Sequence, residues 1–284
     1  MTFYSPLRYP GGKKRLVDFF KKVVIKNSLR GGVYVEPYAG GASIALSLLI
    51  DGYISKVIIN DLDRSIYAFW YSVLFRTEEL CTLIKKTPVN IKTWKIQKKI
   101  QKKEDKEDLL KLGFSTFFLN RTNRSGILKA GIIGGLEQKG KWKINSRYNK
   151  KDLIEKIRKI ASYRDKIKLY NQDAIKFLKN TSKKLPEKTL IYLDPPYYVK
   201  GKDLYMNHYG PKDHKEVAIG IKKVKQNWVI TYDNVPPIEQ LYKGYKKRRY
   251  SLTYSAGNTK KGKEIIFFSK GLKYKESIPK LPNQ

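Results

Sequence analysis

Residues 194–197 combine a carboxylate, a rigid backbone and an aromatic ring: Asp194, Pro195, Pro196 and Tyr197. They follow the apolar residues 191–193, which have the character of a buried strand. Because proline has no N–H group and biases the preceding residue toward an extended backbone, the strand should end at Asp194. The pattern therefore predicts a hydrogen-bond acceptor held beside an aromatic face at the end of a strand. A proline turn with half-buried tyrosines is the alternative interpretation.

A second candidate group is the turn at residues 36–41, which follows a strand-like run and contains Gly40 and Gly41. Two glycines let the backbone bend sharply and approach a ligand closely. Asp61 ends the next strand-like run, and a spacing of about 20 residues suits an acid that accepts hydrogen bonds from ribose hydroxyls. The turn lacks the G-x-G-x-x-G pattern and has no cation for a pyrophosphate. It therefore predicts an adenosine ligand without phosphates, and a purely structural turn is the alternative.

Two further segments could face the same ligand. Around Gly12, a tight loop offers the aromatic face of Tyr9 and the charge of Lys13, although such a loop is also typical of a turn before a helix. Asp173 follows another strand-like run. From the residues alone, it is equally suited to bind an adenine ring or to cap the following helix.

Amide and basic side chains gather in two other segments: Asn120, Arg121, Asn123, Arg124, Ser125, Arg147, Tyr148 and Lys150. Arginine and asparagine form bidentate pairs with guanine and adenine edges, whereas lysine mostly meets phosphate. Arg124, Arg147 and Lys150 are the favoured DNA contacts. The alternative is a buried polar turn at residues 120–126 that positions its surroundings, and Arg121 suits either role. The lysine-rich residues 95–108 are more typical of a solvated helix face.

The composition favours a polyanionic partner, because 60 Lys and Arg against 25 Asp and Glu give a formal charge of +35. A compositional bias toward lysine is the alternative. No window approaches the ~18 consecutive apolar residues of a membrane span, and the N-terminus lacks the features of a secretory signal. One cysteine and two histidines predict neither an internal disulfide nor a structural metal site. A cytoplasmic, DNA-associated location without membrane contact is expected.

The elements that must position these residues alternate between strand-like and helical runs, which is typical of an α/β fold with a doubly wound, mostly parallel sheet. The pattern changes between Asp63 and about Lys166, where amphipathic stretches surround glycine-rich segments. The predicted division is a catalytic domain at 1–62 and 166–271, a largely helical inserted lobe at 63–165, and a tail at 272–284.

Several motifs occur in a fixed order along the chain: "LRYPGGKKRLV", "VEPYAGGAS", "IINDLD", "FFLNRTNRSGI", "RYNKKDLIEKI", "YNQDAIKF" and "LIYLDPPYY". In this order the chain resembles the Dam-like family (D12 class, alpha type) of DNA adenine-N6 methyltransferases, which use S-adenosylmethionine. The resemblance implies that the lobe at 63–165 recognises the target. It also implies the cofactor contacts Tyr9, Gly12, Lys13, Glu36, Pro37, Tyr38, Gly40, Asp61, Asp173 and Asp194. The insertion at 128–145 departs from members that read GATC and leaves the recognition sequence open.

The resemblance also implies the chemistry of residues 194–197. The exocyclic amine of adenine is a poor nucleophile, and acceptors at Asp194 and the Pro195 carbonyl would favour a pyramidal nitrogen with a free lone pair. Pro196 adds rigidity, and Tyr197 would stack on a base flipped out of the duplex. The expected partners are double-stranded DNA and, as a candidate, a cognate restriction endonuclease, with the protein a monomer. Alternatives are cytosine-N4 methylation, an RNA substrate, and a catalytically silent nucleic-acid-binding protein.

Overall fold

The computed structural model describes residues 3–8, 13, 16–199, 209–254 and 260–274. The chain forms two compact units. The sheet unit contains Lys13–Leu62 and Lys166–Tyr254 together with the described residues from Lys260 onward. The helical unit contains Asp63–Asp165 and the described residues of the N-terminal segment 3–8.

The sheet unit is built on a seven-stranded sheet with the strand order β3-β2-β1-β4-β5-β7-β6. The strands are β1 (Val33–Glu36), β2 (Lys56–Asn60), β3 (Ile167–Tyr170), β4 (Thr189–Leu193), β5 (Asn227–Asp233), β6 (Lys246–Tyr254) and β7 (Lys260–Phe268). Strands β1 to β5 pair in parallel, and β7 pairs antiparallel to both β5 and β6. The doubly wound, mostly parallel sheet expected from the sequence is confirmed.

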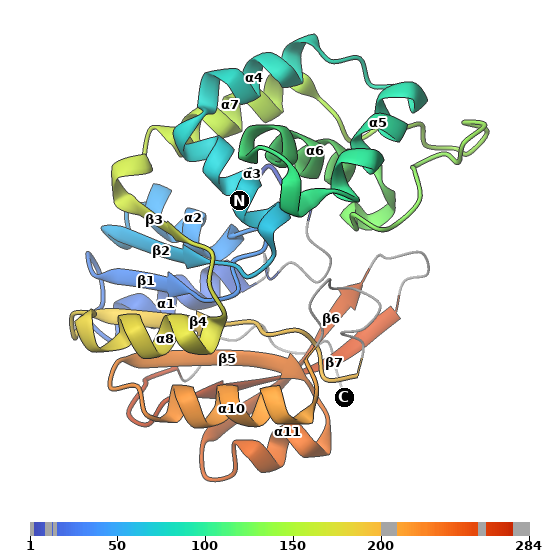
Figure 1. Ribbon diagram of the computed structural model, residues 1–284. Coiled ribbons are helices and arrows are strands. Elements are labelled where there is room, and N and C mark those ends of the chain that lie inside the picture. Colours follow the sequence, from blue (N-terminus) through green and yellow to red (C-terminus); the bar gives the residue numbers. More distant parts are fainter. Residues whose placement is uncertain (1–2, 9–12, 14–15, 200–208, 255–259, 275–284) are drawn as a thin grey trace. The chain divides into compact units, whose positions relative to one another are not determined.

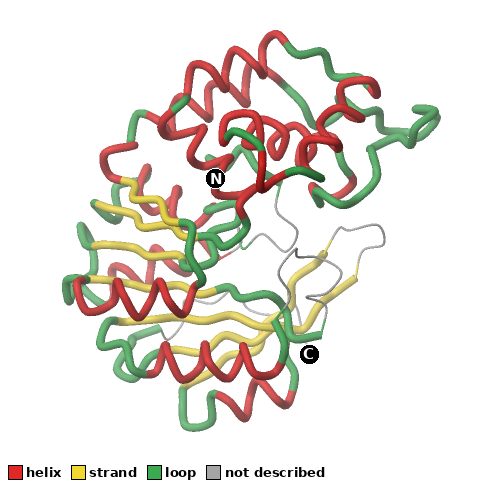
Figure 2. Tube along the Cα trace, in the orientation of Figure 1, coloured by secondary structure: helices red, strands yellow, loops and turns green. Residues whose placement is uncertain are grey.

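Helices cover both faces of this sheet (Figures 1 and 2). Helices α1 (Val17–Lys26) and α2 (Ser43–Ile50) pack together on one face, and α8 (Ala174–Thr181) and α10 (Pro211–Lys222) pack together on the other, with α11 (Pro236–Leu241) beside α10. This arrangement follows from right-handed crossovers that run in opposite directions from the centre of the sheet. The chain order therefore reverses between β1 and β4.

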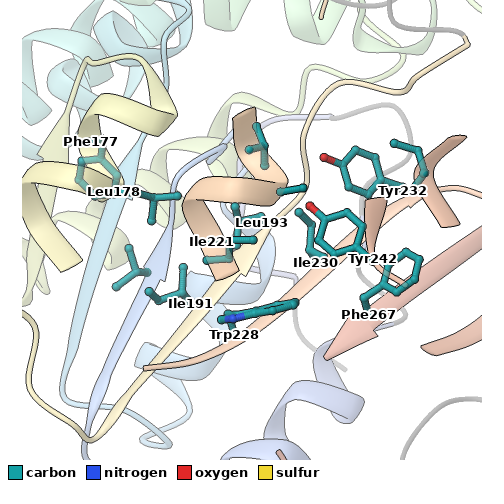
Figure 3. Close-up of a cluster of buried hydrophobic side chains, with 14 of the residues drawn as sticks. Phe177, Leu178, Ile191, Leu193, Ile221, Trp228, Ile230, Tyr232, Tyr242 and Phe267 are labelled. Carbon is teal, nitrogen blue, oxygen red and sulfur yellow. The ribbon is translucent and has the colours of Figure 1, made fainter. Parts of the chain in front are cut away.

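A hydrophobic core lies between β4, β5 and β7 and the helices α8 and α10 (Figure 3). All residues of β4 are buried, as expected for a parallel strand that is covered on both faces. Ile191 and Leu193 of β4 pack in the same cluster as Trp228 and Ile230 of β5. Burying such side chains stabilises the fold by roughly 1.5–3 kcal/mol each. The end of β4, where Asp194 follows, is thereby anchored in the core.

The helical unit consists of α3 (Arg64–Phe75), α4 (Thr77–Lys86), α5 (Ile91–Gln101), α6 (Leu109–Thr122) and α7 (Lys150–Ala161). Helix α6 is buried over most of its length and packs closely on α3. A Cβ atom at Gly113 of α6 would lie 2.4 Å from the Ala68 carbonyl oxygen of α3, so only glycine permits this approach. No helix in the described ranges is long and apolar enough to span a membrane.

Residues 3–8 pack with the helical unit, whereas the sequence pattern predicts that residues 1–62 belong to the catalytic domain. The Asn120 side chain of α6 accepts a hydrogen bond from the Arg8 N–H (2.7 Å) and donates one to the Arg8 carbonyl (2.8 Å). The Arg8 guanidinium also donates to the Asn123 carbonyl at 3.2 Å. These contacts join residues far apart in the chain, which is why the local sequence pattern did not indicate them.

Asn60, the last residue of β2, joins the loops that follow the two neighbouring strands. Its side chain is fully buried. The amide nitrogen donates to the carbonyls of Pro37 and Gln172, each at 2.9 Å, and the amide oxygen accepts from the Gln172 N–H at 3.0 Å. One side chain thus fixes the loops after β1 and β3 against each other.

Replacing Asn60 by alanine should lower the free energy of unfolding by roughly 2–4 kcal/mol, because each lost hydrogen bond between buried groups costs about 1 kcal/mol or more. Urea denaturation measures this loss. The control is Asn171→Ala, because Asn171 is exposed and donates to the Asp61 and Leu62 carbonyls, where water can replace it. Equal losses in the two variants would contradict the role given to Asn60.

Candidate active site

The acidic residues singled out in the sequence follow adjacent parallel strands at their carboxyl ends. Glu36 is the last residue of β1, Asp61 directly follows β2, and Asp194 directly follows β4. Asp173 lies just beyond the end of β3. Since the order of strands reverses between β1 and β4, Glu36 and Asp194 flank the switch point where open α/β sheets bind their ligands.

The glycine turn after β1 is bonded directly to the acid that follows β2. The Gly40 N–H donates to Asp61 Oδ2 at 2.8 Å. Gly40 has a φ of 45°, a left-handed conformation that glycine adopts without a steric penalty. The structure thus brings together two features that the sequence only related by spacing. A carboxylate beside a turn without cations fits the hydroxyls of a ribose and suits the adenosine part of S-adenosylmethionine.

Asp173 caps helix α8. Its Oδ1 accepts hydrogen bonds from the N–H groups of Ile175 and Lys176, each at 3.0 Å. The capping interpretation of the sequence is therefore observed, and contact with an adenine ring remains a prediction.

Tyr38, another predicted cofactor contact, lies in the turn after β1 and donates a hydrogen bond from its hydroxyl to the Tyr209 hydroxyl at 3.2 Å.

Asp194 is held by a chain of hydroxyl groups from the neighbouring strands. Thr231 of β5 donates to Asp194 Oδ1 at 2.6 Å, and Tyr192 of β4 lies 2.8 Å from the same threonine hydroxyl. Because the threonine hydrogen points to Asp194, the tyrosine is the donor to Thr231. The Asp194 side chain is 27% exposed, so it is anchored on one side and accessible on another.

A buried lysine lies against the same carboxylate. The Lys13 ammonium is 3.3 Å from Asp194 Oδ1 and 2.6 Å from Glu264 Oε2 of β7. Burial raises the pKa of Asp194 above its usual range, and the negative charge of Glu264 acts in the same direction. The charge of Lys13 and the hydrogen bond from Thr231 lower this pKa and partly offset the rise.

Three further residues of the site, Glu264, Tyr250 and Thr231, lie on strands β7, β6 and β5 and were not predicted from the sequence. Glu264 is 1% exposed and accepts hydrogen bonds from the hydroxyls of Tyr197 (2.8 Å) and Tyr250 (2.6 Å). The only sequence signal for Glu264 was its position directly before the apolar residues 265–268. A buried glutamate in a strand needs partners, but the sequence did not indicate which residues supply them.

Glu36 is also buried at the centre of this site, with 4% of its surface exposed. Tyr34, on the same face of β1, donates to Glu36 Oε1 at 3.1 Å. Burial raises the pKa of Glu36 to about 8, and the charge of Asp194 contributes to the rise. Below that pH the neutral form dominates, so Glu36 adds little negative charge beside Asp194 at neutral pH.

The aromatic ring of Tyr197 is packed in the interior of the sheet unit. Tyr197 is 6% exposed, and the Lys13 ammonium lies 5.3 Å from its ring centroid. Stacking of this ring on a target base remains a prediction. Tyr9 and Gly12, two of the predicted cofactor contacts, lie outside the described residues.

Several predicted DNA contacts are buried within the helical unit. Asn120 and Asn123 are at most 2% exposed, and Tyr148 is 6% exposed. The Asn123 side chain accepts from the Trp94 indole N–H at 2.7 Å and donates to the Ile127 carbonyl at 3.0 Å. These positions match the alternative interpretation, a buried polar turn that positions its surroundings.

The basic residues of this set have mixed environments. Arg121 donates to the carbonyls of Arg147 (2.6 Å) and Pro6 (3.4 Å), and burial lowers its pKa to about 10. Lys150 donates to the carbonyls of Lys85 and Thr87, each at 2.8 Å. The side chains of Arg124 and Arg147 are exposed, and that of Ser125, next to Arg124, is half-buried. Arg124 and Arg147 are therefore the stronger candidates for DNA contact.

A model of the D12 class N6 adenine-specific DNA methyltransferase family matches residues 9–255. The chain belongs to this family. It is a methyltransferase, and S-adenosylmethionine is its cofactor. A search of curated proteins finds no match.

Solved structures with a similar course of the chain are remote in sequence. A protein from Pyrococcus horikoshii, described as a candidate RNA methyltransferase, shares 11% identity at a TM-score of 0.43, covering 93% of this chain and 84% of its own. An S-adenosylmethionine-dependent methyltransferase from Agrobacterium tumefaciens shares 8% at a TM-score of 0.42, covering 90% of this chain and 62% of its own. The assignment rests on the family match.

Replacing Asp61 by alanine should weaken S-adenosylmethionine binding by roughly 1.5–3 kcal/mol, because hydrogen bonds to a charged acceptor are lost. Isothermal titration calorimetry measures the change, which corresponds to a factor of roughly 10 to 150 in Kd. The control is Asp51→Ala, which removes a carboxylate paired with Lys21 at the other end of α2. Wild-type affinity in a folded Asp61 variant would show that the turn and the acid do not bind the ribose.

Proposed function

We propose that the protein transfers the methyl group of S-adenosylmethionine to N6 of an adenine that is flipped out of double-stranded DNA at a specific sequence. The observation that carries this proposal is the fixed carboxylate of Asp194, directly before Pro195 and at the switch point of the sheet. Membership of the adenine-specific family supports adenine as the target base and DNA as the substrate.

The chemistry required of the protein is alignment and stabilisation of charge. S-adenosylmethionine supplies an activated methyl group on its sulfonium, so no further activation of the donor is needed. As the nitrogen–methyl bond forms, the bond from the methyl group to the sulfonium breaks, S-adenosylhomocysteine leaves, and positive charge develops on the amine, which then loses one proton to solvent. A carboxylate at Asp194 and a carbonyl at Pro195 that accept the two amine hydrogens stabilise this charge and keep the lone pair directed at the methyl group. The raised pKa of Asp194 makes its carboxylate a stronger acceptor.

Duplex DNA suits the charge and the exposed side chains of the protein. The formal charge of +35 favours binding to phosphates, and Arg124 and Arg147 offer exposed guanidinium groups. An adenine inside a duplex cannot reach a carboxylate at the end of a strand, so the target base must leave the stack. Stacking of the extruded base on an aromatic ring contributes roughly 1–3 kcal/mol, which offsets part of the cost of extrusion.

Asp194→Ala should reduce methyl transfer at least about a hundredfold while leaving DNA affinity nearly unchanged, since the acceptor at the reacting amine is removed and the basic surface is not. Transfer of labelled methyl groups to duplex DNA, followed by nucleoside analysis, measures both rate and target base. Asp165→Ala, at an exposed carboxylate of the helical unit, is the control. A folded Asp194 variant with more than about a tenth of wild-type turnover would refute the role of Asp194, and labelled N4-methylcytosine would refute the target base.

Alanine at Arg124 or Arg147 should cost roughly 1–3 kcal/mol on the cognate duplex and less on unrelated duplex, if these guanidinium groups read base edges. Lys99→Ala on the exposed face of α5 should weaken both duplexes alike and reduce the salt slope by about one unit. Lys99 is chosen for this comparison rather than Lys150 because Lys150 donates to main-chain carbonyls. Fluorescence anisotropy at several salt concentrations measures these effects. Equal losses on both duplexes for the arginines would place sequence recognition elsewhere.

A further inference from the structure

We propose that Glu264 is a positioning residue that holds the Lys13 ammonium and thereby sets the charge of Asp194 during methyl transfer. This inference rests on the proposed role of Asp194 as the acceptor for the reacting amine. Glu264 lies on β7, the antiparallel strand of the sheet, and is separated by 251 positions from Lys13.

The geometry places Lys13 between two carboxylates with unequal contacts. Its Nζ is 2.6 Å from Glu264 Oε2, a full hydrogen bond, and 3.3 Å from Asp194 Oδ1. Lys13 is 4% exposed and Glu264 is 1% exposed, so neither charge is screened by bulk water. The ammonium is therefore held more closely by Glu264, whose negative charge offsets part of the attraction between Lys13 and Asp194.

Glu264 is itself fixed as an ionised acceptor. Both of its oxygens accept hydrogen bonds: Oε1 from the Tyr197 hydroxyl at 2.8 Å, and Oε2 from the Tyr250 hydroxyl at 2.6 Å as well as from Lys13. An ionised carboxylate only accepts hydrogen bonds, and donors on both oxygens favour that form. The same bonds orient Tyr197, so one side chain positions both the cation and the aromatic ring of residues 194–197.

Asp194 must be ionised, and it must also be free to accept a hydrogen bond from the substrate amine. Without the lysine, burial and the negative charge of Glu264 would favour protonation of Asp194, and a protonated carboxyl is a poor acceptor for an amine hydrogen. With a lysine bound to Asp194 alone, the ammonium would compete with the amine for the carboxylate. Division of Lys13 between Glu264 and Asp194 keeps Asp194 ionised and still available to the substrate.

Other titratable and polar groups on the neighbouring strands surround Glu264 and Asp194. The variants used in the test must leave these groups unchanged. They are Tyr34 and Glu36 of β1, Tyr192 of β4, Thr231 of β5, and Tyr250 of β6.

The test compares the acidic limb of the pH dependence of kcat/KM for methyl transfer in Glu264→Gln and Lys13→Met. Loss of the negative charge at Glu264 lowers the pKa of Asp194, so the limb should move to lower pH by about one unit, with a reduced kcat. Loss of the positive charge at Lys13 raises this pKa, so the limb should move to higher pH. Glu239→Gln, at a partly exposed carboxylate paired with Arg249, should leave the limb in place. Circular dichroism verifies folding.

Opposite shifts in the two variants support the inference. A limb that is unchanged in Glu264→Gln, or that moves to higher pH as in Lys13→Met, would overturn it while Asp194→Ala remains inactive. An active Asp194→Ala would instead refute the proposed function. If Glu264→Gln does not fold, the double variant Lys13→Met/Glu264→Gln decides, because replacing both partners of a buried ion pair is less destabilising than removing one. Its limb should return toward the wild-type position, and a shift as large as in Lys13→Met alone would contradict a role of Glu264.

Discussion

The Lys13 ammonium lies between the buried Glu264 carboxylate and the partly exposed Asp194 carboxylate, and the rest of the site depends on this contact. The three groups come from the segment before α1, from β7 and from the end of β4. They meet only when β7 has inserted antiparallel beside β5, which places Glu264 opposite Asp233. Because a buried charge without a partner is costly, the site favours the completed sheet over partly assembled ones. Folding and formation of the site are therefore coupled.

The remaining features of the site follow from the parallel strands. Strands β2, β1 and β4 end at one edge, so the residues after each strand converge there although they are far apart in the sequence. Asn60 then fixes two of the loops, and Asp61 fixes the glycine turn through the Gly40 N–H. The edge is thus rigid at main-chain level. A rigid edge suits a reaction in which the protein mainly aligns two reactants.

Local patterns in the sequence predicted the parallel sheet, the end of β4 before Asp194 and the approach of Asp61 to the glycine turn, because strand periodicity, proline and glycine act over a few residues. They did not indicate Glu264 or Thr231, whose roles depend on the pairing of distant strands. Nor did they separate buried from exposed polar residues in the helical unit. Asn120 and Arg124 are four residues apart, yet Asn120 is buried against Arg8 while Arg124 is exposed.

We propose above that Asp194, held at the switch point of the sheet, directs a methyl group to adenine N6 in duplex DNA. Single-molecule sequencing of DNA from cells that express the protein tests it most directly, because base, position and sequence context are read together. We expect N6-methyladenine at one defined sequence on duplex DNA, and its absence in cells that express Asp194→Asn. Modified cytosine at a defined sequence, or N6-methyladenine that persists with Asp194→Asn, would contradict it.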